Sequence, residues 1–280
     1  MSNIKFSAFS DEYATDFGEQ LAGMNKLGIG NIELRFIDGR NVSELSTEEA
    51  KQLKKRLDGA GIGVSAIGSP LGKIRLDGDM KGHMDTAERI FEIANIMETK
   101  FIRMFSFYAP EGEDIHSMRD EAFSAVAEML ARAKKYGVTL CHENEAKIFG
   151  DTAENCRALL DAFGGELKCV FDMGNFVLEG VEPWAAYELL RGDVAYFHIK
   201  DALFAGAIVP PSKGDAKIGE ILGAHKQYAK EDFFVSLEPH LQTFSGLNAL
   251  KHRDFDNPYK YEDLESAFVD AVNKFRGLML

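Results

Sequence analysis

Short apolar runs alternate along the chain with longer segments in which apolar residues recur every three to four positions. The short runs are rich in Val, Ile and Phe and lack strict alternation, which is typical of β-strands covered on both faces. The longer segments have the period of amphipathic helices. The pattern predicts eight strands, at residues 4–9, 31–36, 63–68, 101–107, 138–141, 168–171, 194–199 and 233–237.

Capping residues mark where several of the predicted helices begin and end. Ser46 with Glu49 forms a capping box in front of one helix, and Asp151 with Glu154 is expected to do the same for a later one. Gly137 is expected to end the helix that precedes the fifth strand.

A strand followed by a helix, repeated eight times, predicts an α/β fold with a single (β/α)8 TIM barrel over residues 1–280. An open doubly wound sheet has the same alternation. However, no Gly-x-Gly-x-x-Gly sequence follows the first strand, so nothing favours a dinucleotide-binding sheet.

Four successive predicted strands end in a residue that can bind a metal: Glu143, Asp172, His198 and Glu238. The C-terminal ends of barrel strands meet at one face, where the chemistry of such barrels takes place. Taken alone, Asp172 suits a helix cap and Glu143 an exposed loop. Together, three carboxylates and one imidazole indicate one shared divalent ion, with Mn²⁺, Mg²⁺, Co²⁺ or Zn²⁺ as candidates.

Further polar residues near these strand ends are candidates for binding a substrate: Lys200, His240, Glu145 and Asn175. Lys200 and His240 each lie two positions beyond a candidate ligand and therefore share its face of the chain. Glu145 is in phase with Glu143, although an exposed loop position is an equal alternative. His142 has the opposite phase and is expected to point away from the site.

Two other polar residues are assigned structural roles. Arg103, unusual in a barrel strand, is expected to pair with a buried acid such as Glu33, and Asp201 is expected to orient the following loop. The long loops at residues 203–215 and 241–263 are expected to cover the pocket, and for the second loop an oligomer arm is an equal alternative.

The sequences HENEAKIFGDT, FDMGNF, HIKDA and SLEPHL, in this order, resemble those of the xylose isomerase-like TIM barrels. This superfamily includes the sugar phosphate isomerase/epimerase group, the AP endonuclease family 2 (endonuclease IV) and inosose dehydratase. The resemblance implies one divalent metal held by Glu143, Asp172, His198 and Glu238. It also implies that Glu143 and Glu238 act as an acid/base pair, which moves a proton on a ketose or keto-sugar through an enediolate.

Two other functions remain open beside this sugar isomerase or epimerase. A dehydratase or lyase acting on a keto-sugar or keto-inositol begins with the same proton abstraction and would use the same residues. A non-catalytic sugar-binding barrel is the third reading, since a fold alone does not imply activity. DNA repair is disfavoured, because Asn175 stands where the endonuclease motif has a histidine.

The resemblance implies a small-molecule sugar as the partner, and the composition disfavours nucleic acid and membrane partners. The net charge of −13 repels nucleic acid. Three cysteines without a Cys-x-x-Cys spacing, no signal peptide and no membrane-length apolar window predict a cytoplasmic protein without a membrane partner. A homodimer is compatible with the resemblance, because related barrels often dimerise.

Overall fold

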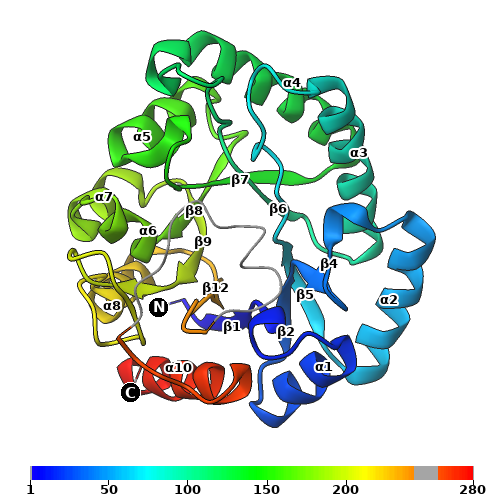
Figure 1. The fold of residues 1–280 in the computed structure, drawn as a ribbon, viewed down its shortest axis with the longest axis vertical. Helices are drawn as coiled ribbons and strands as arrows, with labels where there is room; N and C mark the ends of the chain where they lie inside the picture. Colours follow the sequence, from blue (N-terminus) through cyan, green and yellow to red (C-terminus); the bar gives the residue numbers. More distant parts are fainter. Residues whose placement is uncertain (1, 243–257, 280) are drawn as a thin grey trace.

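Eight parallel strands form one sheet that curls into a nearly closed barrel (Figure 1). The computed structural model describes residues 2–242 and 258–279. The strands are β1 Ile4–Ala8, β2 Asn31–Leu34, β5 Gly63–Ile67, β6 Phe101–Met104, β7 Thr139–Glu143, β8 Lys168–Asp172, β9 Val194–Ile199 and β12 Phe233–Leu237. Their order, β1-β12-β9-β8-β7-β6-β5-β2, follows the chain around the barrel, and β1 and β2 lie side by side where the ring closes. The predicted α/β barrel is confirmed.

Helices surround the sheet on its outer side (Figure 1). They are α1 Phe17–Lys26, α2 Thr47–Ala60, α3 Met80–Ile96, α4 Arg119–Tyr136, α5 Ala153–Ala162, α6 Met173–Leu178, α7 Pro183–Leu190, α8 Ile218–Tyr228 and α10 Leu264–Leu278. Single 3-10 turns lie at η1 Ser10–Glu12, η2 Val42–Glu44, η3 Ile115–Met118 and η4 Phe149–Asp151. Two small hairpins pair β3 Phe36–Ile37 with β4 Arg40–Asn41, and β10 Asp201–Ala202 with β11 Ile208–Val209.

Most of the predicted helix boundaries agree with the structure, and one is wrong. The capping box at Ser46 opens α2, and Gly137 ends α4 in the left-handed conformation. In front of α5, however, the Thr152 hydroxyl accepts from the Asn155 N–H, so Thr152 is the cap. Asp151 belongs to η4, because the helix begins one residue later than predicted.

Two strands that carry candidate site residues are longer than predicted. β7 continues through His142 to Glu143, and β8 continues to Asp172, so these residues belong to strands and not to loops. The strand ending at Met104 is shorter than predicted. Phe107 has a φ of 66°, a left-handed conformation that does not fit an extended strand.

Side chains inside the barrel lie in layers, because alternate residues of each strand point inwards. One buried layer consists of Ala66, Cys141, Val170, Tyr196 and Phe234. Two positions further along β7, β8 and β9 stand Glu143, Asp172 and His198. The apolar layer therefore forms the floor on which the candidate ligands stand. The larger hydrophobic core fills the space between the sheet and the helices.

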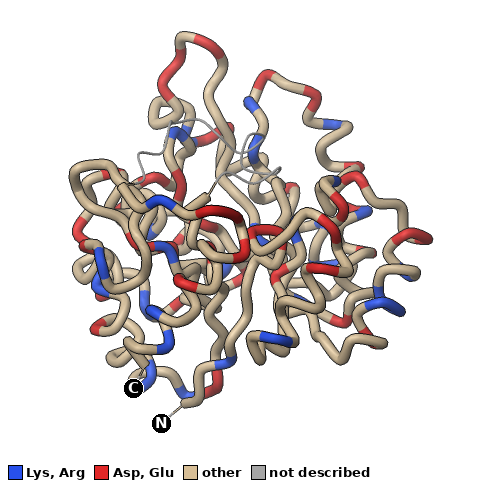
Figure 2. Tube along the Cα trace, turned by 60° about the horizontal axis from the view of Figure 1, so that its bottom comes forward, with Lys and Arg blue, Asp and Glu red and all other residues tan. Residues whose placement is uncertain are grey.

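Charged residues of both signs are interspersed along the chain (Figure 2). Acidic residues are in the majority, with 45 Asp and Glu against 32 Lys and Arg. In the part of the chain that the structure describes, none of the helices has the length and apolar character needed to cross a membrane. The cytoplasmic location and the homodimer remain predictions.

Candidate metal centre

The structure brings the four predicted ligands together at the C-terminal end of the barrel. Glu143, Asp172, His198 and Glu238 are all buried, and each offers one ligand atom within 4.8 Å of the others. Strand register explains this arrangement, since Asp172 on β8 lies beside His198 on β9. The backbone N–H of Glu238, just beyond β12, donates to the Ile199 carbonyl at the end of β9. This spacing suits a single ion.

His198 stands at the centre of the group. Its Nδ1 lies 2.8 Å from Glu143 Oε1, 3.5 Å from Glu238 Oε2 and 3.9 Å from Asp172 Oδ2. Its Nε2 lies 3.0 Å from Glu33 Oε2 on the opposite side of the ring. Burial alone would lower the pKa of His198, but Glu143 and Glu33 outweigh it and raise the pKa to about 10.

Lys200 and Asn175, two of the predicted substrate-binding residues, lie at the same centre. Lys200 Nζ donates to Asp172 Oδ2 at 2.8 Å, to Asn175 Oδ1 at 3.0 Å and to Glu238 Oε2 at 3.1 Å. Gly174 allows this approach, because a Cβ there would lie 2.8 Å from the Lys200 backbone oxygen. The lysine is thus held inside the site and not on a solvated loop.

Asp172 both caps a helix and faces the candidate metal centre. Its Oδ1 accepts from the Asn175 N–H and caps α6, while its Oδ2 faces Lys200. Burial, together with Glu143 and Glu238, raises the pKa of Asp172, and Lys200 lowers it; the resulting pKa is about 7. The carboxylates are therefore crowded enough to disfavour one another's charge.

Two buried arginines, which the sequence patterns did not assign to the site, also contact these carboxylates. Arg35 at the end of β2 places Nη1 2.6 Å from Glu238 Oε1. Arg103 on β6 places Nη1 3.2 Å from Glu143 Oε2 and 3.6 Å from Glu238 Oε1. Arg103 thus pairs with buried acids as expected, but these acids are Glu143 and Glu238, whereas Glu33 is bound by Tyr196 and His198.

The arginines and their neighbours keep the two proposed proton carriers ionised. Burial would raise the pKa of Glu143, but His198 and Arg103 lower it to about 2. Burial would likewise raise the pKa of Glu238, but Lys200 and other neighbouring cations hold it well below its usual value. In the free protein, both side chains therefore favour the anionic form, which is the form that accepts a proton.

Glu12 is a further member of the site that sequence reasoning missed. It lies in η1 directly after β1, where its Oε1 accepts from Arg35 Nη2 at 3.0 Å. Its Oε2 accepts from the backbone N–H of His240 at 2.7 Å. His240 is buried with a φ of 49°, and its Nε2 lies 3.5 Å from Glu238 Oε1. An acid directly after the first predicted strand was the signal available in the sequence.

Glu145, just beyond β7, and His142, on β7, lie away from the candidate ligands. Glu145 is only half-buried at the rim, where its carboxylate pairs with Lys73 at 3.1 Å. His142 points outwards from the barrel as expected, and its Nε2 lies 2.9 Å from Ser106 Oγ. Burial lowers the pKa of His142 to about 4, so this histidine is neutral at pH 7.

Asn144, which the sequence did not single out, joins the ends of β7 and β8. Its Nδ2 donates to the Asp172 carbonyl at 2.9 Å, and its Oδ1 accepts from the Asp172 N–H at 3.0 Å. Its own carbonyl accepts from Asn175 Nδ2 at 2.9 Å. Asn144 therefore fixes the backbone from which two site residues project.

The loop after β9 is organised by Asp201, as predicted. The Asp201 carboxylate accepts from the backbone N–H groups of Lys213, Gly214 and Ala216 at 3.0–3.2 Å. Most of the second predicted covering loop, with Phe244 and Phe255, lies outside the described residues.

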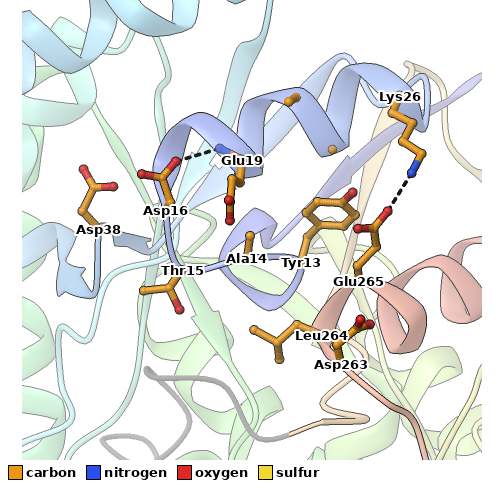
Figure 3. A pocket seen from close by; sticks show the side chains of 12 residues that line it. Tyr13, Ala14, Thr15, Asp16, Glu19, Lys26, Asp38, Asp263, Leu264 and Glu265 are labelled. Carbon is orange, nitrogen blue, oxygen red and sulfur yellow. Dashed lines mark hydrogen bonds and ion pairs between the residues drawn. The ribbon is translucent and has the colours of Figure 1, made fainter.

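A separate hollow of about 860 Å³ lies between α1 and α10, outside the barrel (Figure 3). Its acidic lining is engaged in local structure: Asp16 and Asp263 cap these two helices, and Asp38 accepts from the first N–H of α1. Glu265 pairs with Lys26 at 2.7 Å. These contacts account for the acidic residues without a ligand.

Comparison with known proteins places this barrel among its relatives. The family model described as xylose isomerase-like TIM barrel matches residues 21–264. The chain belongs to this family. None of the curated proteins matches the chain in sequence. Three solved structures of similar fold illustrate the range of xylose isomerase-like barrels.

The probable 3-DHS dehydratase AsbF of Bacillus anthracis is 18% identical, with 99% of each chain covered and a TM-score of 0.73. L-ribulose 3-epimerase is 19% identical, with a TM-score of 0.70 over 99% of this chain and 94% of that one. The IOLI protein with a binding zinc atom is 15% identical, with a TM-score of 0.72 over 98% of both chains. At these identities the likeness establishes the shared fold.

Proposed function

We propose that this xylose isomerase-like barrel is a divalent-metal-dependent isomerase or epimerase of a ketose or keto-sugar. The observation that carries the proposal is the convergence of three carboxylates and one imidazole from consecutive strands on one buried point. The epimerase and the zinc-containing barrel among the structural neighbours support the same assignment.

The charge balance of the site supports a bound cation. Among the described residues, six buried carboxylates are linked in one network: Asp11, Glu12, Glu33, Glu143, Asp172 and Glu238. The cations in this network are Arg35, Arg103, Lys200 and, because its pKa is raised to about 10, His198. Buried charge without a partner is costly, so a divalent ion would offset much of the negative excess.

The donor set restricts which ion fits. Oxygen ligands with one nitrogen and no thiolate suit Mn²⁺, Mg²⁺ or Co²⁺, and Zn²⁺ also accepts such a set. Glu143, Asp172, His198 and Glu238 would hold the ion. When bound, it supplies a Lewis acid that polarises the sugar carbonyl and stabilises the enediolate oxygens.

Glu143 and Glu238 are placed to move the proton. Glu143 ends β7 and Glu238 follows β12, and two strands, β8 and β9, separate them in the sheet. The carboxylates therefore approach the centre from different sides. The carboxylate on one face, as the anion, would remove the proton next to the sugar carbonyl. The carboxyl group on the other face, when it carries a proton, would give that proton to the opposite face of the enediolate.

Other polar residues of the centre would orient the sugar. Lys200, Asn175 and His240 supply buried donors and acceptors beside Glu238. Glu145, at the rim, would meet a substrate that extends out of the barrel.

Elimination of a hydroxyl group is the second candidate reaction. Lys200 favours it, because its ammonium group lies within the site and would donate a hydrogen bond to a leaving hydroxyl. One neighbour of the same fold is a probable dehydratase. Both reactions begin with the same proton abstraction, so the product distinguishes them.

Proton NMR of a panel of ketoses and keto-sugars in D₂O tests the proposal. Zn²⁺- or Mg²⁺-loaded protein is expected to introduce deuterium next to the carbonyl, and Glu238→Gln is expected to abolish this exchange. The exposed Glu128→Gln on α4 is the matched control and should retain it. A rearranged sugar identifies an isomerase or epimerase, and a lost hydroxyl a dehydratase. Metal and sugar binding without any exchange would contradict catalysis and favour a sugar-binding barrel.

A further inference from the structure

The floor of the barrel contains one carboxylate that is not among the proposed ligands. Glu33 on β2 is 1% exposed and lies in register with Ala66 on β5. It therefore belongs to the layer directly beneath the candidate metal centre. The apolar members of this layer are Ala66, Cys141, Val170, Tyr196 and Phe234, and Arg103 stands in register with Cys141.

The two oxygens of Glu33 are bound by two residues of one strand. Oε2 lies 3.0 Å from His198 Nε2, and Oε1 accepts from the Tyr196 hydroxyl at 3.0 Å. Tyr196 and His198 are two positions apart on β9, so both point into the barrel. Tyr196 is held in turn by stacking on Phe234, with ring centroids 4.3 Å apart.

This arrangement decides which nitrogen of His198 faces the ligands. Carboxylate oxygens accept hydrogen bonds from an imidazole N–H, so the pairing with Glu33 turns Nε2 towards the floor of the barrel. Nδ1 is then the nitrogen directed at Glu143, Glu238 and Asp172. In metal sites, a carboxylate bound to the far nitrogen of a histidine fixes the ring and raises its basicity as a ligand.

We propose that Glu33 is a positioning residue for the metal centre, which, with Tyr196, locks His198 so that Nδ1 binds the ion. The inference rests on the proposed function, since it concerns the same ion. Arg103 does not hold His198 in place of Glu33, because its Nε and Nη2 donate to the backbone carbonyls of Ser69 and Gly68.

Co²⁺ and Zn²⁺ binding by the intact protein tests the proposal. We expect Glu33→Gln to lower the affinity for both ions by about 10- to 100-fold, as measured by calorimetry. The visible absorption of bound Co²⁺ should change as well, because the ligand geometry is altered. Tyr196→Phe removes one hydrogen bond to Glu33 and should weaken binding by less than about tenfold.

Val126→Ala on α4 is the matched control. It removes buried methyl groups from the core between the sheet and the helices, so it should lower the melting temperature without altering the barrel interior that holds Glu33 and His198. Its metal affinity and Co²⁺ spectrum should equal those of the wild type. This comparison separates a positioning role from a general loss of stability.

Imidazole NMR of ¹⁵N-histidine protein loaded with Zn²⁺ gives a second readout. The wild type should show His198 with a slowly exchanging Nε2 proton, which Glu33→Gln should lose. Unchanged affinity, Co²⁺ spectrum and Nε2 proton in Glu33→Gln would overturn this inference alone. A wild type that binds neither ion would overturn the proposed function, and the inference with it.

Discussion

At the scale of single residues, the site consists of charged groups that are tolerated only because each has a partner. Glu238 is the clearest case, since Arg35, Lys200 and Arg103 all approach its carboxylate. When one partner is removed from such a network, a buried charge or dipole is left without a compensating group. Residue-scale changes in this region should therefore have large effects on both stability and binding.

Asn144→Ala is predicted to destabilise the protein by about 2–4 kcal/mol. The change leaves the buried N–H and carbonyl of Asp172 without the partners that they have in the wild type. Urea unfolding at pH 7.5 measures the effect, with the exposed Asn25→Ala on α1 as a control. A loss no larger than that of the control would contradict the role given to Asn144.

The sequence correctly predicted the direction of a side chain where this direction follows from the two-residue period of a strand. His198 and Lys200 are two positions apart and both point inwards, while His142 is out of phase and points away. It failed for Glu12 and Arg35, whose roles depend on contacts with strands far away in the chain. Local pattern contains no information about such partners.

At the scale of elements, the face of α8 that packs against the barrel contains a buried histidine, His225. His225 packs edge-on against Phe197 on β9 and Phe233 on β12, and its Nδ1 lies 3.2 Å from the Tyr187 hydroxyl. Burial lowers the pKa of His225 to about 4. The helix therefore docks with a neutral imidazole.

This docking predicts a loss of stability on mild acidification. The unfolded chain protonates His225 near pH 6.5, but the folded protein does so only near pH 4. The stability that neutral His225 contributes is thus complete above pH 6.5 and is lost as the pH falls towards 4, by at most about 3 kcal/mol.

Urea unfolding at pH 7.5 and pH 5.0 measures this effect. Wild type should lose more stability between the two pH values than His225→Phe, which keeps an aromatic ring against the strands. Carboxylates that titrate in this range are common to both proteins and cancel in the comparison. Equal losses in the two proteins would show that His225 is not the group responsible.

At the scale of the whole molecule, the barrel gathers acids that are far apart in the sequence. Glu12 and Glu238 are separated by more than two hundred residues, yet Arg35 binds both. Closure of the sheet by β1 against β12 produces this contact. Concentrated negative charge opposes folding unless a cation compensates it.

A divalent ion is therefore predicted to stabilise the folded protein. Mn²⁺ or Zn²⁺ at about one hundred times its dissociation constant should add about 2.7 kcal/mol to the free energy of unfolding, and chelation should reverse the gain. Thermal melts with and without metal measure it. The stabilisation should disappear in Asp172→Asn and persist in the exposed Asp58→Asn; an equal gain in both would indicate that the ion binds elsewhere.

The sequence alone determined the barrel and the four candidate ligands. Strand and helix periods are local properties, and a ligand at the end of each of β7, β8, β9 and β12 follows from them once the strands are parallel. Strand ends were less certain, as the continuation of β7 to Glu143 shows, because hydrogen bonding to neighbouring strands decides where a ladder stops.

Only the tertiary structure decided the partners of these ligands. Glu33 beneath His198, Arg103 beside Glu143 and Arg35 between Glu12 and Glu238 come from other strands of the barrel than the residues they contact. Their contacts depend on the register and curvature of the closed sheet, and these properties arise from all eight strands together. The electrostatic energy between two charged side chains depends on their distance in space, and this distance cannot be obtained from their spacing along the chain.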